Sequence, residues 1–166
     1  MKLNGLIYTL PKEIKVLISA FVIVLSIGYL GGLIFVGETT SAKPEGIEEQ
    51  YLGNEDDEGA TVMKFKKSEK ELLTTVHNHI LSMSIIFFLL GGLVSITDLN
   101  KKLKRCLIVE PFISVILTFG GIYLLWKGIL WMKYVVMISG ILMTICFCFA
   151  VIIILYQLIN PKETTK

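Results

Sequence analysis

The amino-acid sequence predicts an all-α integral membrane protein, a bundle of four transmembrane helices with both termini in the cytoplasm. Of its 166 residues, 54% are hydrophobic and 18% are charged, whereas soluble domains are typically about 45–50% apolar and about 25% charged. The apolar residues form four long runs, each close to the ~20 residues that a helix needs to cross a bilayer. Helices are favoured because lipid cannot satisfy backbone N–H and C=O groups, and the sequence lacks the period-two alternation of barrel strands. The four runs cover residues 14–36, 76–96, 107–125 and 134–159.

The first predicted helix, at residues 14–36, follows the basic residues Lys2, Lys12 and Lys15, a flank that a secretory signal peptide also has. Its apolar run is longer than the roughly 7–15 residues of a signal core, and no A-x-A cleavage site follows it. We therefore expect a retained transmembrane helix.

Residues 37–68 are the only extramembrane segment of any size, and we expect them to form a loop outside the cytoplasm. The segment contains turn-forming residues and an acidic stretch. It is too short to hold a core of its own, but long enough to fold back over the helix ends as a lid. Ser68 and Glu71 fit the S-x-x-E capping box, so the second helix is expected over residues 69–97, entering the membrane near Val76.

The third and fourth helices are predicted over residues 107–126 and 131–159. Trp126, Trp131 and Tyr134 surround the short turn between them, and such side chains favour the membrane–water boundary. The tight turn predicts an antiparallel hairpin. We expect the whole chain, including this hairpin, to form one membrane domain.

Basic residues predict the orientation of the bundle. The short connection between the second and third helices carries four of them, and short basic connections usually lie in the cytoplasm. This placement puts both termini inside the cell. A second basic cluster, in the predicted outer segment, runs against the rule. The first cluster is Lys101, Lys102, Lys104 and Arg105, and the second is Lys64, Lys66, Lys67 and Lys70.

Two histidines, His77 and His79, stand near the start of the second helix. A spacing of i,i+2 turns about 200° around a helix, so the two rings leave on nearly opposite faces. They cannot both bind one haem from within one helix, nor do they match the i,i+4 spacing of a zinc pair. Because the chain has only 2 histidines, a haem or copper site would need a methionine such as Met83 or Met137, a water, or a second copy of the chain.

Other interpretations of these histidines remain open. Each could be an interfacial histidine that bonds to a neighbouring polar residue or water, or a residue that handles protons or contacts a quinone. His79 is the stronger ligand candidate, since it lies about 3 Å deeper than His77 and Met83 stands at i+4 on its face. The polar neighbours are Thr74, Thr75 and Asn78.

Glu110 is the other unusual residue. Pro111 fits the first turn of a helix, and a carboxylate there would meet the positive end of the helix dipole. With Lys104 and Arg105 one to two turns earlier, Glu110 is interpreted as a structural anchor at the cytoplasmic face. A proton-path carboxylate is the alternative, at the membrane face opposite the histidines.

Small residues occur in all four predicted helices, where they let membrane helices approach closely; a ligand crevice is the alternative. The sequence contains no nucleophile–base pair, P-loop or nucleotide-binding glycine pattern, so nothing in it indicates an enzyme. The net charge of +2 is too small to suggest nucleic-acid binding. The small residues are Gly28, Gly31, Gly32, Gly91, Gly92, Gly120, Gly121 and Gly140.

The stretch YLGNEDDEGATVMKFKKSEKELLTTVHNHILSMSIIFFLLGG resembles a family of small, uncharacterised bacterial inner-membrane proteins. The shared features are a Y-x-G turn, a K-S-x-x-E-L-L opening, H-x-H at the start of the second helix, and a four-helix layout over roughly residues 20–160. The resemblance implies this topology and an inner-membrane location, without an activity. A fainter similarity links H-x-H-[IL] to helix openings in the haem-binding subunits of respiratory oxidases and nitric oxide reductases.

Two functional classes follow. The first is a redox-associated protein that binds haem, copper or a quinone near the outer leaflet through the H-x-H motif. The second is a non-catalytic accessory subunit or scaffold, whose glycine faces dock partner helices. In both, the chain contacts the lipid bilayer, and it associates with copies of itself or with a larger membrane complex.

Overall fold

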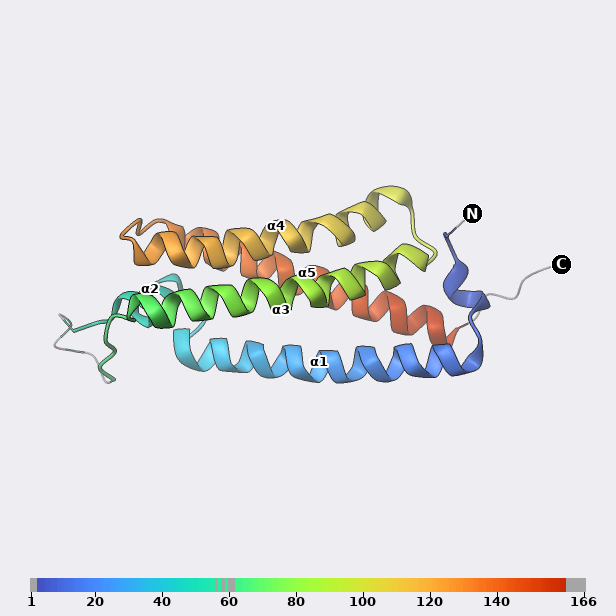
Figure 1. Cartoon of the computed structure of the whole chain (residues 1–166), viewed down its shortest axis with the longest axis horizontal. Coiled ribbons are helices and arrows are strands. Elements are labelled where there is room, and N and C mark those ends of the chain that lie inside the picture. The colour runs from blue at the N-terminus through green and yellow to red at the C-terminus, as the bar shows by residue number, and fades with distance from the viewer. Residues whose placement is uncertain (1–2, 56, 58, 60–61, 161–166) are drawn as a thin grey trace.

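A computed structural model describes residues 3–55, 57, 59 and 62–160 of the chain. This part is helical and contains no strand. Four helices are long and apolar enough to cross a membrane (Figure 1), which confirms the predicted all-α class. In chain order the elements are η1 (Leu6–Thr9), α1 (Lys12–Thr40), α2 (Pro44–Leu52), α3 (Glu69–Ile96), α4 (Lys101–Trp126) and α5 (Met132–Ile159).

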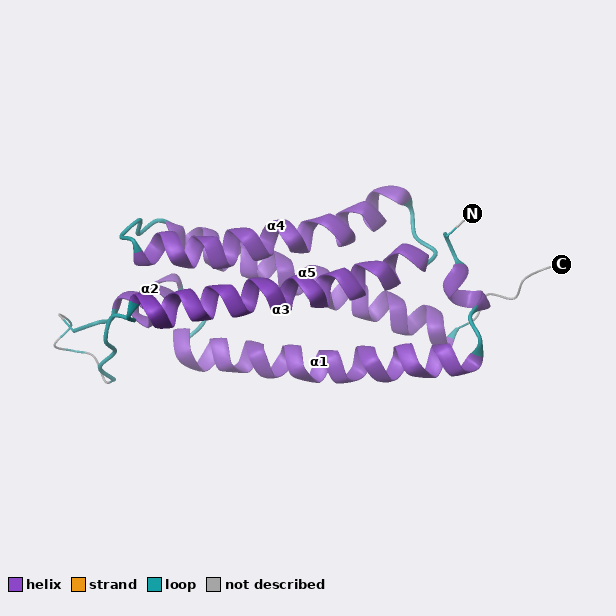
Figure 2. Ribbon diagram, viewed as in Figure 1, coloured by secondary structure: helices purple, strands orange, loops and turns teal. Residues whose placement is uncertain are grey.

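Both described ends of the chain lie at one end of the bundle, which we call the termini end (Figure 1). The opposite end, here the α2 end, carries α2 and the turn between α4 and α5. Figure 2 shows that the loops are confined to these two ends, with helix throughout the middle. An even number of spans accounts for the common location of the termini.

The start of α4 lies further from its prediction than any other end of a membrane-spanning helix, at Lys101 rather than at residue 107. The side chain of Asn100 caps it by accepting a hydrogen bond from the Leu103 amide at 2.8 Å. The prediction that Pro111 occupies the first turn is therefore wrong, since Pro111 lies inside the helix. Charged residues mark where the apolar layer ends, but they do not stop a helix that continues into the headgroup region.

The start of α3 has the capping box that its sequence predicts. The Glu71 amide donates to Ser68 Oγ at 3.3 Å, and the Ser68 amide donates to Glu71 Oε2 at 3.0 Å. These reciprocal bonds satisfy two of the N–H groups that every helix start leaves without a partner inside the helix.

The α4–α5 hairpin forms the most extensive helix pair, and α3 packs mainly on α4. At the α4–α5 contact, Thr118 and Ser139 share a buried hydrogen bond of 2.7 Å. Helix α1 is peripheral: it packs chiefly on α2 and α5 and has three buried residues among the 29 of the helix. Those residues are Val22, Tyr29 and Thr40.

The segment predicted as an outer loop contains the end of α1 and the short helix α2, which the sequence analysis did not foresee. Pro44 stands in the first turn of α2, where its missing N–H removes no bond. Helix α2 folds back over the ends of α4 and α5. Lys133 at the start of α5 bonds to Glu48 at 2.7 Å and lies 3.8 Å from Glu45. The indole N–H of Trp126, at the end of α4, donates to the carbonyl oxygen of Lys67 at 2.8 Å.

At the termini end, the N-terminal segment that contains η1 packs against the α3–α4 connection, where the Gly5 amide donates to the Thr97 carbonyl oxygen at 3.3 Å. Ile7 is fully buried there. The Lys104 ammonium donates to Asn4 Oδ1 at 2.7 Å and to the carbonyls of Ser95 and Thr97 at 2.9 and 2.7 Å. This basic residue therefore ties the N-terminal segment to the α3–α4 connection.

Candidate functional sites

Both predicted histidines lie on α3, towards the α2 end, and both are exposed. Nδ1 of His79 is 2.8 Å from the Thr75 carbonyl oxygen. Because a carbonyl only accepts, Nδ1 must carry the proton, and a neutral ring then has Nε2 as an acceptor. The ring also lies against Phe119 of α4, with 4.9 Å between the ring centroids.

The other predicted ligands are His77, Met83 and Met137. His77 has no hydrogen-bond partner among the described residues. Met83 and Met137 are partly buried and pack against the hydrophobic core, as flexible apolar side chains commonly do. Within the described chain, no group of three or more His, Cys, Asp or Glu side chains is arranged to hold a metal ion.

Glu110 occupies the third turn of α4 and is set among polar groups that the sequence alone does not bring together. Ser114, one turn further on, donates its hydroxyl proton to Glu110 Oε1. The Cys146 thiol of α5 lies beside the same carboxyl. Glu110 Oε2 is buried and has no hydrogen-bond partner in the described chain.

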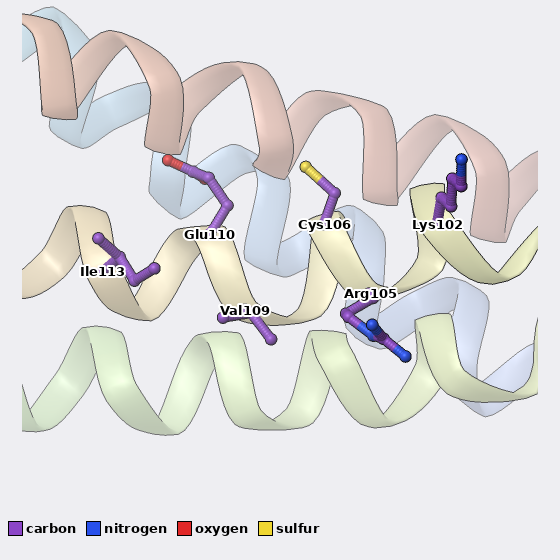
Figure 3. A pocket seen from close by; sticks show the side chains of 6 residues that line it. All are labelled: Lys102, Arg105, Cys106, Val109, Glu110 and Ile113. Atoms are coloured by element: carbon purple, nitrogen blue, oxygen red, sulfur yellow. The ribbon is translucent and has the colours of Figure 1, made fainter.

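A shallow groove of about 430 Å³ runs along α4 from its basic first turns to Glu110. In Figure 3 the side chains of Lys102, Cys106 and Glu110 form a row on the edge of α4 next to α5. Arg105 and Val109 lie on the other edge of the groove. The spacing i, i+4, i+8 of that row is the signal in the sequence that could have revealed the groove.

The α2 end contains a second set of partly polar contacts. Lys66 and Lys127 both lie over the Trp126 ring, at 5.0 and 4.9 Å from its centroid. Burial raises the pKa of the Tyr51 phenol in α2 above its ordinary value of 10.0. These contacts fix the extramembrane segment on the bundle, but they bring together no catalytic set of groups.

Four apolar helices, an interior with few polar groups and short connections define an integral membrane protein. The model of a family described as a transmembrane helical domain, Aq_1264_TM, matches residues 41–165. The match covers about three quarters of the chain, and the chain belongs to this family. It begins directly after α1 and includes every helix from α2 onward. No curated protein sequence and no solved structure matches the chain.

Proposed function

We propose that this chain is a non-catalytic accessory subunit or scaffold of a membrane complex, and that α1 docks a transmembrane helix of a partner protein. The observation that carries the proposal is the open glycine face of α1. Gly28, Gly31 and Gly32 are exposed, and a Cβ atom added to any of them would meet no other atom within 4 Å.

Glycine has a visible packing role elsewhere in the bundle. A Cβ at Gly121 of α4 would lie 2.8 Å from Val136 of α5, so that glycine allows the two helices to approach. Gly28 and Gly32 could allow the same close approach on α1, but no other described helix of the bundle packs on their side of α1. Since lipid tails are as apolar as leucine, close packing between small residues is a main source of helix association in membranes.

The boundary of the family match supports the same function. The matched unit begins at residue 41, and α1 ends at Thr40. Helix α1 also makes fewer contacts with α3, α4 and α5 than these three make with one another. A helix added to the edge of a packed unit is well placed to join that unit to another protein.

Photo-crosslinking in the native membrane tests this function. A photoreactive amino acid at Val24, on the glycine side of α1, should give a discrete protein adduct. Gly28→Leu or Gly32→Leu should abolish that adduct, while the same photoreactive residue at Ile152 of α5 should give none. Absence of an adduct at Val24 would contradict the proposal and mean that this side of α1 faces lipid. An adduct of twice the chain mass would mean that α1 docks a second copy of the chain instead of a partner protein.

A cofactor site at the H-x-H motif is the second candidate function, and one observation favours it. With Nδ1 of His79 held by the Thr75 carbonyl, Nε2 is oriented as a ligand, which is the usual arrangement of a metal-bound histidine. Haem or copper with Met83 or Met137, or a quinone, would then lie near the outer leaflet. A visible spectrum and metal analysis of the purified protein test this candidate: His79→Ala should lose the cofactor, and His77→Ala should retain it.

The location proposed with either function is the inner membrane of a bacterium, with the termini end in the cytoplasm. The basic cluster that begins α4 lies at the termini end, which supports this orientation. In a background without Cys106 and Cys148, Glu55→Cys should react with an impermeant thiol reagent added to intact cells, and Lys102→Cys should not. The opposite labelling pattern would reverse the orientation.

A further inference from the structure

The basic start of α4 has no part in the docking function proposed for α1. Its side chains and two grooves that run from them along the helix form a surface with a charged end and an apolar length. We propose that this surface binds an anionic phospholipid, whose phosphate contacts Arg105 and whose two acyl chains occupy the grooves. The inference rests on the unpaired basic side chains, the position of the two grooves, and the order of charged and apolar surface along α4.

Three of the four basic side chains in the first two turns of α4 have no partner inside the described chain. Lys101, Lys102 and Arg105 are exposed, and no described residue forms an ion pair or a side-chain hydrogen bond with them. Lys104 differs, because three oxygen atoms of the termini end hold its ammonium. The nearest acid in the sequence, Asp98, acts electrostatically on Lys104. Like charges this close on one helix repel one another, so an anion from outside the protein would stabilise them.

Two shallow grooves lie on either side of a ridge formed by Arg105 and Val109, which stand one turn apart on α4 and line both grooves. The larger groove, of about 430 Å³, lies on the side towards α5 (Figure 3). The smaller, of about 330 Å³, lies towards α3, where Ile108 is beside Gly91. A diacyl phospholipid has the matching form, one phosphate with two chains. The other lining residues are Lys102, Cys106, Glu110 and Ile113 in the larger groove, and Lys101, Lys104 and Ile108 in the smaller.

The surface also matches a phospholipid along the helix axis. The basic cluster ends at Arg105, and the apolar run of α4 begins at Leu107. Val109 and Ile113, which line the larger groove, are exposed residues of the spanning segment. Ile113 lies eight residues beyond Arg105, or about 12 Å along the axis at 1.5 Å per residue. A lipid with its phosphate at Arg105 therefore has its acyl chains against the apolar part of α4.

The charge of the surface favours an anionic headgroup. A guanidinium can donate two parallel N–H bonds to a phosphate, and basic pockets between membrane helices bind anionic headgroups. Lys101 and Lys102, on either side of Arg105, would repel the ammonium of phosphatidylethanolamine, a group that phosphatidylglycerol lacks. Glu110 is the one acid among the residues that line the grooves. Its carboxyl bonds to Ser114 and points towards α5, at the level of the acyl chains and not of the phosphate (Figure 3).

Native mass spectrometry of the full-length protein in detergent micelles tests the proposal. Phosphatidylglycerol and phosphatidylethanolamine with identical acyl chains are added at equal concentration, and the wild-type protein should preferentially retain phosphatidylglycerol. The variant with Lys101→Gln, Lys102→Gln and Arg105→Gln should reduce this preference on the order of a hundredfold, because each basic residue near a membrane surface changes the affinity for anionic lipid about fivefold. If that variant does not fold, Arg105→Gln alone should reduce the preference about fivefold.

The α2 end offers a matched control for the loss of charge. The variant with Lys66→Gln, Lys67→Gln and Lys70→Gln also removes three positive charges, but from the opposite end of the bundle. It should retain the preference of the wild-type protein for phosphatidylglycerol. An equal loss in the two triple variants would mean that net charge, and not the α4 surface, selects the lipid.

The grooves are tested separately from the charge. Ile113→Trp fills the far part of the larger groove and should weaken phosphatidylglycerol binding, whereas Ile116→Trp, exposed on α4 but outside both grooves, should not. Inorganic phosphate, which has no acyl chains, should not displace the bound lipid. Four results would overturn the proposal: equal retention of the two lipids, equal effects of the two triple variants, equal effects of the two tryptophan variants, or displacement of the lipid by phosphate.

Discussion

The α4–α5 contact offers a matched pair of substitutions at adjacent glycines. A Cβ at Gly121 would lie 2.8 Å from Val136 Cγ2 and 3.5 Å from Met132 Cε, whereas a Cβ at Gly120 would meet nothing within 4 Å. Carbon atoms pack best at about 3.5–4.0 Å. The methionine methyl can move, but Cγ2 of the buried Val136 cannot withdraw without turning its whole branched side chain.

Gly121→Ala should therefore lower the free energy of unfolding by about 1–3 kcal/mol relative to Gly120→Ala, the range for overpacking a core. Both variants gain the same helix preference of alanine over glycine, so that contribution cancels in the comparison. Reversible unfolding in mixed detergent micelles, followed by circular dichroism, measures the difference. When the two glycine variants are made in a Val136→Ala background, most of this stability difference should disappear. The part that disappears is the coupling energy between residue 121 and Val136.

Equal stability of Gly120→Ala and Gly121→Ala would refute the reasoning, because it would mean that α4 and α5 do not approach at Gly121. A difference that persists in the Val136→Ala background would contradict the assignment of the clash to Val136. Either result would also weaken the packing comparison used for the glycines of α1.

Three further outcomes are expected at the α2 end. Ser68→Ala, which removes the cap of α3, should lower the free energy of unfolding by about 1 kcal/mol; an unchanged value would show that Glu71 alone satisfies the helix start. Lys133→Met removes the contacts to Glu48 and should speed proteolysis between α2 and α3, with only a small loss of global stability, because surface ion pairs contribute little. Because burial raises the pKa of Tyr51 above 10.0, the folded state holds that proton more tightly. The resulting stability is complete below pH 10 and declines as the pH rises through the raised pKa, and Tyr51→Phe should reduce this alkaline loss in unfolding titrations.

Hydropathy predicted the four membrane-spanning helices because the cost of exposing polar groups to lipid depends on composition, which a sequence displays directly. The start of α3 was also predictable, since the Ser68–Glu71 capping box is local. The start of α4 was not, because the apolar run begins six residues after Lys101. That run marks the lipid boundary, whereas the helix start depends on the Asn100 cap.

Helix α2 escaped prediction for a different reason. Its residues combine Pro44, Gly46 and several acids, which are typical of loops, and a nine-residue helix is marginal in water. It is held by contacts that only the fold supplies. Gly46 is essential to one of them, since a Cβ there would come within 1.8 Å of the Thr40 carbonyl oxygen.

The sequence identified the candidate site residues, but it did not identify the side chains from other helices that surround them. The contact between Ser114 and Glu110 follows from i,i+4 spacing on one helix. The approach of Cys146 to Glu110, and that of Phe119 to His79, depend on how separate helices are rotated against one another. Four helices of similar hydropathy leave that rotation undetermined until their packing is known.

Polar contacts between elements show why α5 is the central helix of the bundle. Ser139 of α5 bonds to Thr118 of α4 at 2.7 Å, and Thr144 bonds to Tyr29 of α1 at 3.2 Å. Gln157 accepts from the amide of Asp98 at 2.8 Å and donates to its carbonyl at 3.1 Å, tying α5 to the α3–α4 connection. Helix α5 is the most hydrophobic of the four spans, and Ser139, Thr144 and Gln157 gain hydrogen bonds by facing a neighbouring element instead of lipid. Each turns towards a different neighbour, and together they set the register of α1, α4 and the α3–α4 connection against one helix.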